Sequence, residues 1–102
     1  MGKPISAVGN KTTGHSTYKP RAAIGGSTSV FVNGLGVNCI GDLWAPHGAA
    51  PAFRGDPHPA ESTHVTTSGS TTVFVNDKGV ARIGDLVELD TIAAGSPDVF
   101  AG

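Results

Sequence analysis

The sequence predicts an all-β protein of hairpins with pseudo-threefold symmetry, built from three internal repeats. The main observation is that the segment Gly26–Leu43 recurs 43 residues later as Gly69–Leu86, with 13 identities in 18 positions. The composition agrees, because 15 glycines, 7 prolines and only 15% charged residues in 102 favour short strands and turns over long helices. A repeat of this kind outranks other sequence signals, because each copy forms one structural unit.

Fragments at the two ends of the chain supply the third copy. Ser6–Asn10 matches the end of the repeated segment, and Gly95–Phe100 matches its beginning. We therefore predict one domain, 1–102, with repeat units of about 6–33, 37–76 and 80–101. Each unit opens with Val/Ile-Gly-Asp/Asn and closes with Gly-Ser-x-x-Val-Phe. The loops inside the units differ in length, with 15 residues (11–25), 26 residues (43–68) and 9 residues (86–94).

The frame of each unit reads as a hairpin. Ser29–Val32 is β-branched and aromatic, Asn33–Gly36 has turn chemistry, and Val37–Ile40 returns. Asn76–Gly79 predicts the second turn of the same kind. The Gly-Asp pairs at 41–42 and 84–85 predict further turns, in which the aspartate accepts hydrogen bonds from backbone amides.

Alternation along the strands predicts which side chains form the core. Phe31, Phe74 and Phe100 occupy three equivalent positions, on the strand face opposite to the flanking valines. In a small pseudo-threefold molecule we expect this trio to pack around the axis as core. Cys39 falls inside a hairpin strand and is expected to be a reduced structural cysteine.

All four histidines fall in the predicted loops rather than in the hairpins. His15 and His47 each lie five residues after the Asn or Asp that ends the frame, and Asp90 takes that place in the third unit. His64 lies at the other end of the second loop, which is long enough to return it to the first two. Three imidazoles suit zinc, or iron as a competitor, so we predict a metal site of His15, His47 and His64. His58 is a candidate for the fourth ligand.

Other functional classes lack support. The net charge of −1 gives no basic patch for nucleic acid, and one cysteine gives no disulfide framework. No apolar run after Met1 could serve as a signal peptide or membrane span, so we expect synthesis in the cytoplasm without export. The sequence contains no G-x-S-x-G nucleophile turn and no phosphate-binding loop before a helix.

These motifs resemble those of the PAAR-repeat family, small proteins that cap the spikes of contractile injection machines. The residues concerned are Val80–Asp85, its copies Val37–Asp42 and Ala7–Asn10, and the three Gly-Ser-x-x-Val-Phe strands. The resemblance implies a short β-cone whose base docks on a trimeric β-helical spike and whose point carries a metal bound by histidines and a cysteine. That cysteine is expected after the third Gly-Asp, where this chain has Leu86–Asp90. The fourth ligand is therefore open among Asp90, Glu88, His58 and water.

The expected function is that of a structural tip protein, not an enzyme. It would cap and sharpen the spike of a phage tail or a type VI-like secretion machine, one copy per trimer, and aid membrane piercing. The expected location is the tip of a spike or baseplate, in a virion or an injected particle. The chain resembles the stand-alone type without an effector extension. Effector or baseplate proteins and, transiently, the target membrane would be further partners. The alternatives are a free-standing metal-binding adaptor and a small zinc hydrolase with a three-histidine site.

Three bare strand edges at the end of a trimer invite pairing, and a monomer with three repeats can cover all three. A metal would cross-link loops that have little core beneath them, since structural zinc contributes on the order of 10 kcal/mol in small domains.

Overall fold

The computed structural model describes residues 2–14, 20–45, 64–88 and 90–102. Within these ranges the chain is all-β, as predicted, and its ten short strands pair as five antiparallel ladders. No helix capable of crossing a membrane occurs in the described ranges. The strands are β1 (Lys3–Pro4), β2 (Phe31–Val32), β3 (Leu35–Gly36), β4 (Leu43–Trp44), β5 (His64–Val65), β6 (Phe74–Val75), β7 (Lys78–Gly79), β8 (Leu86–Val87), β9 (Asp90–Thr91) and β10 (Phe100–Ala101).

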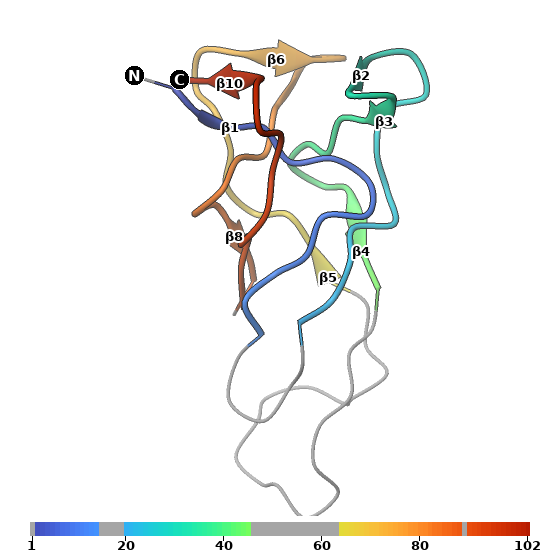
Figure 1. The fold of residues 1–102 in the computed structure, drawn as a ribbon, viewed down its shortest axis with the longest axis vertical. Coiled ribbons are helices and arrows are strands. Elements are labelled where there is room, and N and C mark those ends of the chain that lie inside the picture. The colour runs from blue at the N-terminus through green and yellow to red at the C-terminus, as the bar shows by residue number, and fades with distance from the viewer. Residues whose placement is uncertain (1, 15–19, 46–63, 89) are drawn as a thin grey trace, which may run out of the picture.

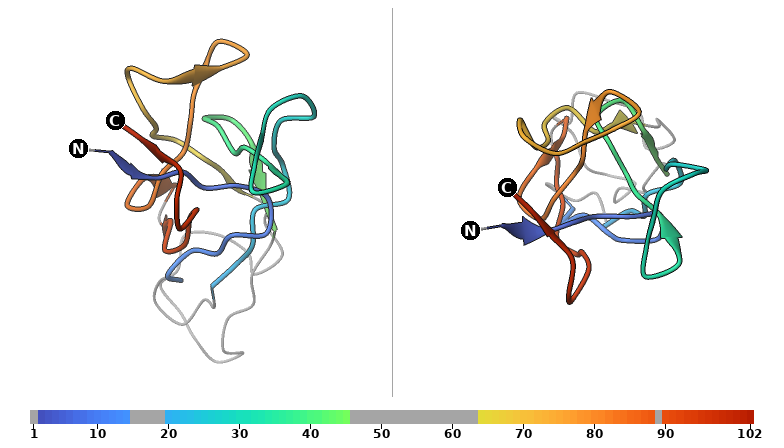
Figure 2. Two further views of the ribbon diagram at one scale, coloured as in Figure 1. Left: turned by 45° about the horizontal axis from the view of Figure 1, so that its top comes forward. Right: turned by 90° about the horizontal axis from the view of Figure 1, so that it is seen from above.

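Three ladders gather at one end of the molecule and are called here the base tier (Figure 1). They are β2–β3, β6–β7 and β1–β10, and they lie around a central axis when the molecule is seen from above (Figure 2). Their registers are the same, because Phe31 pairs with Gly36, Phe74 with Gly79 and Phe100 with Pro4. The two ends of the chain thus form the third hairpin, which confirms the pseudo-threefold arrangement.

Two-residue turns close the two continuous hairpins. Asn33 and Gly34 have φ of 54° and 79°, and Asn76 and Asp77 have φ of 52° and 66°. Two successive positive φ values are typical of the type I′ turn, whose twist matches that of the strands. The turns are therefore shorter than the predicted four residues, and pairing resumes already at Leu35 and Lys78.

A closed ring of backbone hydrogen bonds surrounds the axis beneath the base tier. The amide of Ser6 donates to the carbonyl of Ala81 (2.8 Å), Ala81 donates to Asn38 (2.8 Å), and Asn38 donates back to Ser6 (3.0 Å). All three residues are fully buried, with exposed fractions of 0%. Each repeat contributes one member, so the three units close on one another through this ring.

The predicted aspartate turns follow the ring in every unit. In each one a side-chain oxygen accepts a hydrogen bond of 2.8 Å from the amide three residues earlier, and the intervening glycine has φ of 93–94°. The three turns contain Ala7, Gly9 and Asn10; Cys39, Gly41 and Asp42; and Arg82, Gly84 and Asp85. The prediction that these residues cap backbone amides is confirmed, and Asn10 does the same as the two aspartates.

The prediction that the phenylalanines form the core is wrong. Phe31, Phe74 and Phe100 are 57%, 57% and 53% exposed. The residues on the opposite strand face point inward instead, since Val32 is 7% and Ala101 3% exposed. Smaller side chains fill the interior instead: Ile5, Val32, Val37, Cys39, Val80 and Ala101.

Cys39 is a free, buried strand residue, as expected, and bridges to Val80. Burial, with a smaller effect of Asp42, raises the pKa of its thiol to about 11. Such a thiol is almost wholly protonated at neutral pH and is a poor metal ligand.

A second tier continues away from the base. It consists of β4–β5, β8–β9 and the bridge between Lys11 and Ala22, and is called here the lower tier. Its own core contains Ala23, Trp44, Ala81, Val87 and Ile92.

Candidate functional site

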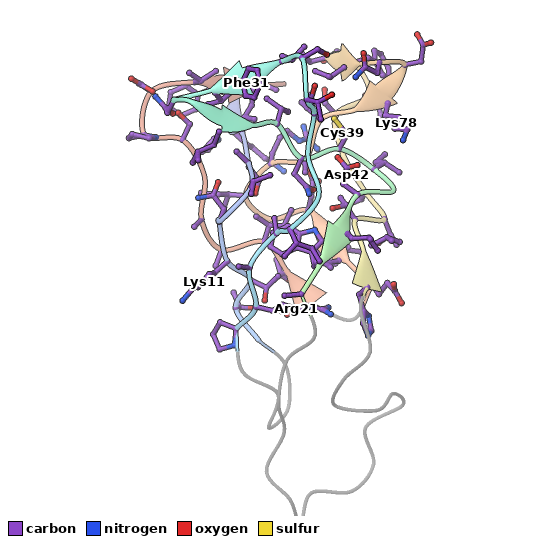
Figure 3. All side chains as sticks on the ribbon, turned by 90° about the vertical axis from the view of Figure 1, so that its right-hand side faces the viewer. Lys11, Arg21, Phe31, Cys39, Asp42 and Lys78 are labelled. Carbon is purple, nitrogen blue, oxygen red and sulfur yellow. The ribbon has the colours of Figure 1, made fainter. Side chains whose placement is uncertain are left out.

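The lower tier places one buried polar side chain from each repeat on its returning strand. His64 pairs with Trp44, and Asp90 occupies the same position opposite Val87. In the first unit the equivalent residue is Arg21, which lies opposite Thr12. The amide of Arg21 donates a hydrogen bond to Oγ1 of Thr12, and the carbonyl of Arg21 accepts one from the amide of Thr12. The three residues are nearly inaccessible, with exposed fractions of 3% for Arg21, 5% for His64 and 1% for Asp90. Figure 3 shows Arg21 at this end of the molecule, far from Phe31 in the base tier.

His64 lies against a carboxylate of the third unit. Its Nδ1 is 3.2 Å from Oε1 of Glu88. The other oxygen, Oε2, accepts a hydrogen bond from the amide of Val65 (3.0 Å), and the amide of Glu88 itself donates to Oγ1 of Thr67 (3.3 Å). Glu88 thus reaches both the imidazole of His64 and the backbone of the next residue.

Asp90 is engaged by a different set of groups. Its Oδ2 is 3.5 Å from Nε of Arg21, and both side chains are 0% exposed. Its Oδ1 accepts hydrogen bonds from the amide of Thr91 (2.9 Å) and from Oγ1 of Thr13 (3.2 Å). The guanidinium also donates to the carbonyl of Val87 (3.1 Å). Burial lowers the pKa of Arg21, and the charges of Asp90 and Glu88 oppose this effect.

The contacts of His64, Asp90 and Glu88 bear on the predicted metal site. His64 is a buried imidazole with a carboxylate oxygen 3.2 Å from its Nδ1, and zinc-binding histidines often have a carboxylate near the second ring nitrogen. Asp90 faces a buried guanidinium, which would repel a metal cation bound to it, and Glu88 is directed at His64 and Val65. Within the described ranges no three metal-binding side chains come together. His15, His47 and His58 lie outside the described residues.

The strand register gives Asp90 a different set of equivalent residues from the one obtained by counting along the sequence. That alignment counted five residues forward from the Asn or Asp of each frame, and the third loop is so short that this count already reaches the returning strand β9. The strand register makes Asp90 equivalent to Arg21 and His64 instead.

Arg21 was not among the site residues predicted from the sequence. The signal was present, because Arg21, His64 and Asp90 each precede the Gly of a Gly-Ser pair by five residues.

The base tier offers a second candidate site, an exposed apolar face. Serine turns hold its strands in place: Oγ of Ser27 accepts hydrogen bonds from the amides of Ser29 and Val30. Ser70 and Ser96 make the same turn in the other units. Clustered exposed apolar residues mark interaction surfaces. Those of the base tier are Val30 (40%), Phe31 (57%), Leu35 (45%), Val73 (38%), Phe74 (57%) and Phe100 (53%).

Comparison with known proteins identifies the family. The family model described as PAAR motif matches residues 13–87, which is most of the chain. No match to a curated protein was found. The matched segment contains two complete hairpins and two of the three glycine turns, the features that also carried the resemblance in the sequence. The chain therefore belongs to the PAAR motif family, structural proteins that sit at the spike tips of contractile injection and type VI-like secretion machines.

Proposed function

We propose that this chain caps a trimeric β-helical spike, one copy per trimer, and docks through the base tier. The observation that supports this proposal is the exposure of Phe31, Phe74 and Phe100 on three ladders of identical register. A monomer with three equivalent apolar contacts can meet each chain of a trimer in the same way. The cap would cover the strand edges of the spike and narrow it to a point for membrane piercing.

The energetics favour the phenylalanines as the main contacts. Aromatic side chains that become fully buried in an interface are frequent hot spots, and truncating one costs about 2 kcal/mol or more. The same side chains contribute little to the cone alone, because more than half of each is exposed to solvent. Their substitution should weaken docking while leaving the fold stable.

A binding experiment with a trimeric spike tests this. We expect one chain per trimer by light scattering, and Phe74→Ser should weaken binding at least tenfold, since about 1.4 kcal/mol corresponds to a factor of ten. Leu86→Ser is the matched control, because Leu86 is also an exposed apolar residue (47%) but belongs to the lower tier. A complex with three chains per trimer, or equal weakening by both variants, would contradict the capping model.

We further propose that His15, His47 and His64 bind zinc, with iron as the alternative, and that the metal ties the loops together at the point. The support is the buried imidazole of His64 and its carboxylate neighbour. Because Asp90 faces Arg21 and Glu88 faces His64, His58 or a water molecule is the better candidate for the fourth ligand. The metal would act as a structural cross-link between loops of different units.

Elemental analysis and metal removal test the site. We expect about one metal ion per chain, and its removal should lower the melting temperature by ten degrees or more, since structural zinc contributes on the order of 10 kcal/mol. His64→Ala should abolish binding, and His58→Ala should reduce it only if His58 is the fourth ligand. An unchanged melting temperature after complete metal removal would refute the structural role.

The two other candidate functions have less support. A groove of about 110 Å³ between the first and third units is smaller than typical substrate pockets of about 300–1,000 Å³. None of its lining side chains titrates: Ile5, Ala7, Asn10, Val32, Asn33, Leu35, Ser96 and Pro97. A free-standing metal-binding adaptor would have no preference for a threefold partner. The ratio of one chain per spike trimer, measured by light scattering, therefore distinguishes the capping function from the adaptor function. Effector proteins, baseplate proteins and the target membrane remain proposed partners of the assembled tip.

A further inference from the structure

We propose that Asn33 is a site of deamidation, that its contact with Ser96 and Asp98 holds the reaction back, and that the product cannot re-form this contact. Deamidation converts the side-chain amide of asparagine into a carboxylate. The site lies in the turn of the β2–β3 hairpin, where the first unit meets the third. Neither docking on a spike nor metal binding is needed for it.

Asn33 is the only asparagine of the chain that precedes a glycine. In deamidation the backbone nitrogen of the following residue attacks Cγ of the asparagine, and a side chain on that residue hinders the attack. Gly34 has no side chain, and its backbone reaches conformations closed to other residues. The other asparagines precede lysine, cysteine and aspartate, and they are Asn10, Asn38 and Asn76. The chemistry therefore favours Asn33 over the other three.

The reaction balances with water as the only co-reactant. The amide nitrogen of Gly34 forms a bond to Cγ of Asn33, the bond from Cγ to Nδ2 breaks, and Nδ2 leaves as ammonia with the proton of the attacking nitrogen. Water then adds to one carbonyl carbon of the cyclic imide, the bond from this carbon to nitrogen breaks, and the nitrogen takes up a proton. The product is aspartate or isoaspartate at position 33. Both residues of the turn are exposed, so water reaches the site.

The hairpin turn keeps the two reacting atoms apart. Asn33 and Gly34 have φ of 54° and 79°, as in a type I′ turn. In this turn, the mirror image of type I, φ and ψ of the first turn residue are both positive, which places the nitrogen of Gly34 nearly opposite to Cβ of Asn33. Ring closure therefore requires a rotation about the Cα–C bond of Asn33. This rotation opens the turn and separates Val32 from Leu35, which are paired beside it.

The third unit holds both ends of the Asn33 amide. Nδ2 of Asn33 donates to Oδ1 of Asp98 (3.0 Å), and Oδ1 of Asn33 accepts from the hydroxyl of Ser96 (2.6 Å). The same hydroxyl lies 2.9 Å from Oδ1 of Asp98. The hydrogen bonds from Asn33 and Ser96 lower the pKa of Asp98, so its carboxylate is charged at neutral pH. The side chain of Asn33 is thus fixed in a position from which it does not react.

The product of the reaction loses this contact. A carboxylate at position 33 would place an oxygen where Nδ2 now donates, facing Oδ1 of Asp98 with no proton between the two. Like charges at this separation repel each other. Asn33 re-forms the contact after each opening, whereas the deamidated residue cannot. One ladder of the base tier, which carries Phe31, would then lose this link to the third unit.

Peptide mapping by mass spectrometry tests the site on the full chain, kept at mildly alkaline pH. We expect deamidation at Asn33, at least about tenfold faster in guanidinium chloride than in buffer, because only the open turn reacts. Asn76 is the internal control, since its turn has the same backbone form but Asp77 follows it. Deamidation of Asn76 as fast as that of Asn33, or equal rates at Asn33 in the folded and unfolded chain, would overturn the proposal.

A variant of Asp98 tests whether the contact holds the reaction back. Asp98→Ala removes the acceptor of Nδ2 and should speed deamidation of the folded protein about threefold to tenfold, as expected for the loss of one hydrogen bond. Ser29→Ala is the matched control, because Ser29 occupies the same place in the serine turn of the second unit. It should leave the rate at Asn33 unchanged. Equal rates in the wild type and Asp98→Ala would refute the protective role of the contact.

Thermal unfolding measures the effect of the product. Asn33→Asp carries the carboxylate from the start and should lower the melting temperature. Adding Asp98→Asn restores one amide and one carboxylate with their positions exchanged, so the double variant should regain most of the loss. A wild-type melting temperature for Asn33→Asp, or no recovery in the double variant, would show that the carboxylate does not break the contact through repulsion by Asp98.

Discussion

Single polar side chains hold the frame of this protein at the residue scale. Asp42 and Asp85 accept the amides of Cys39 and Arg82, and Asn10 accepts the amide of Ala7, each at 2.8 Å. Each bond stabilises a turn in which a glycine between the donor and the acceptor residue has a positive φ. The presence of Asn in one unit shows that the turn needs an acceptor oxygen and not a negative charge.

This comparison predicts the effect of two substitutions at Asp42. Asp42→Ala leaves the amide of Cys39 without its acceptor and should lower the free energy of unfolding by about 1–2 kcal/mol. Asp42→Asn keeps the acceptor, as at Asn10, and should lower it by less than about 0.5 kcal/mol. Urea unfolding of the three proteins measures both values. Equal losses in the two variants would show that the charge of Asp42, rather than its hydrogen bond, stabilises the turn.

The hairpin is the unit of construction at the element scale, and the third one is divided between the chain ends. Ala101 pairs with Lys3 as Val32 pairs with Leu35 and Val75 with Lys78. Figure 2 shows the two termini close together beside β1 and β10. The carbonyl of Gly102 is held there by the hydroxyls of Ser70 and Thr72.

The shared register predicts that the chain tolerates circular permutation. Removing Met1 and joining Gly102 to Gly2 places two residues between Ala101 and Lys3, as in the other hairpins, and Gly-Gly suits a type I′ turn. New ends are then placed between Asn76 and Asp77. The free energy of unfolding of the permuted protein should lie within about 1 kcal/mol of the wild-type value, because the permutation closes one turn and opens another.

The control for this experiment opens the chain elsewhere. New ends between Asn38 and Cys39 interrupt the hydrogen-bonded ring and should abolish cooperative unfolding, measured by circular dichroism. Equal stability of the two permuted proteins would mean that the ring is not the centre of the fold.

Closure around the axis organises the whole molecule. The amides of Ser6, Asn38 and Ala81 come from segments far apart in sequence, yet each donates to the next in a single ring. All three residues are inaccessible to solvent. No local opening can free one of these amides without separating two repeats.

The ring predicts a pattern of hydrogen exchange for the intact protein. The amides of Ser6, Asn38 and Ala81 should exchange last, with equal protection that matches the global free energy of unfolding. The amide of Ser29, in an exposed serine turn, should exchange much faster. Faster exchange at only one ring position would show that its repeat opens separately from the other two.

Much of the fold follows from sequence because it is local. Asn33-Gly34 and Asn76-Asp77 determine the hairpin turns through their tolerance of positive φ, and Asp42 and Asp85 bond within their own turns. The duplication of these short signals, with a third copy completed across the ends, implies three equivalent hairpins and hence the pseudo-threefold symmetry.

The tertiary structure decided which faces are buried and which polar groups meet. Alternation separates Phe31 from Val32, but only the packing of the three units determines that the valine lies inside and the phenylalanine outside. Because the three loops differ in length, counting from the outgoing strands aligns Asp90 with His15 and His47, whereas the register of the returning strands aligns it with His64. Only the packing of the units against one another brings Arg21 to Asp90 and Glu88 to His64, since these contacts join residues of different repeats.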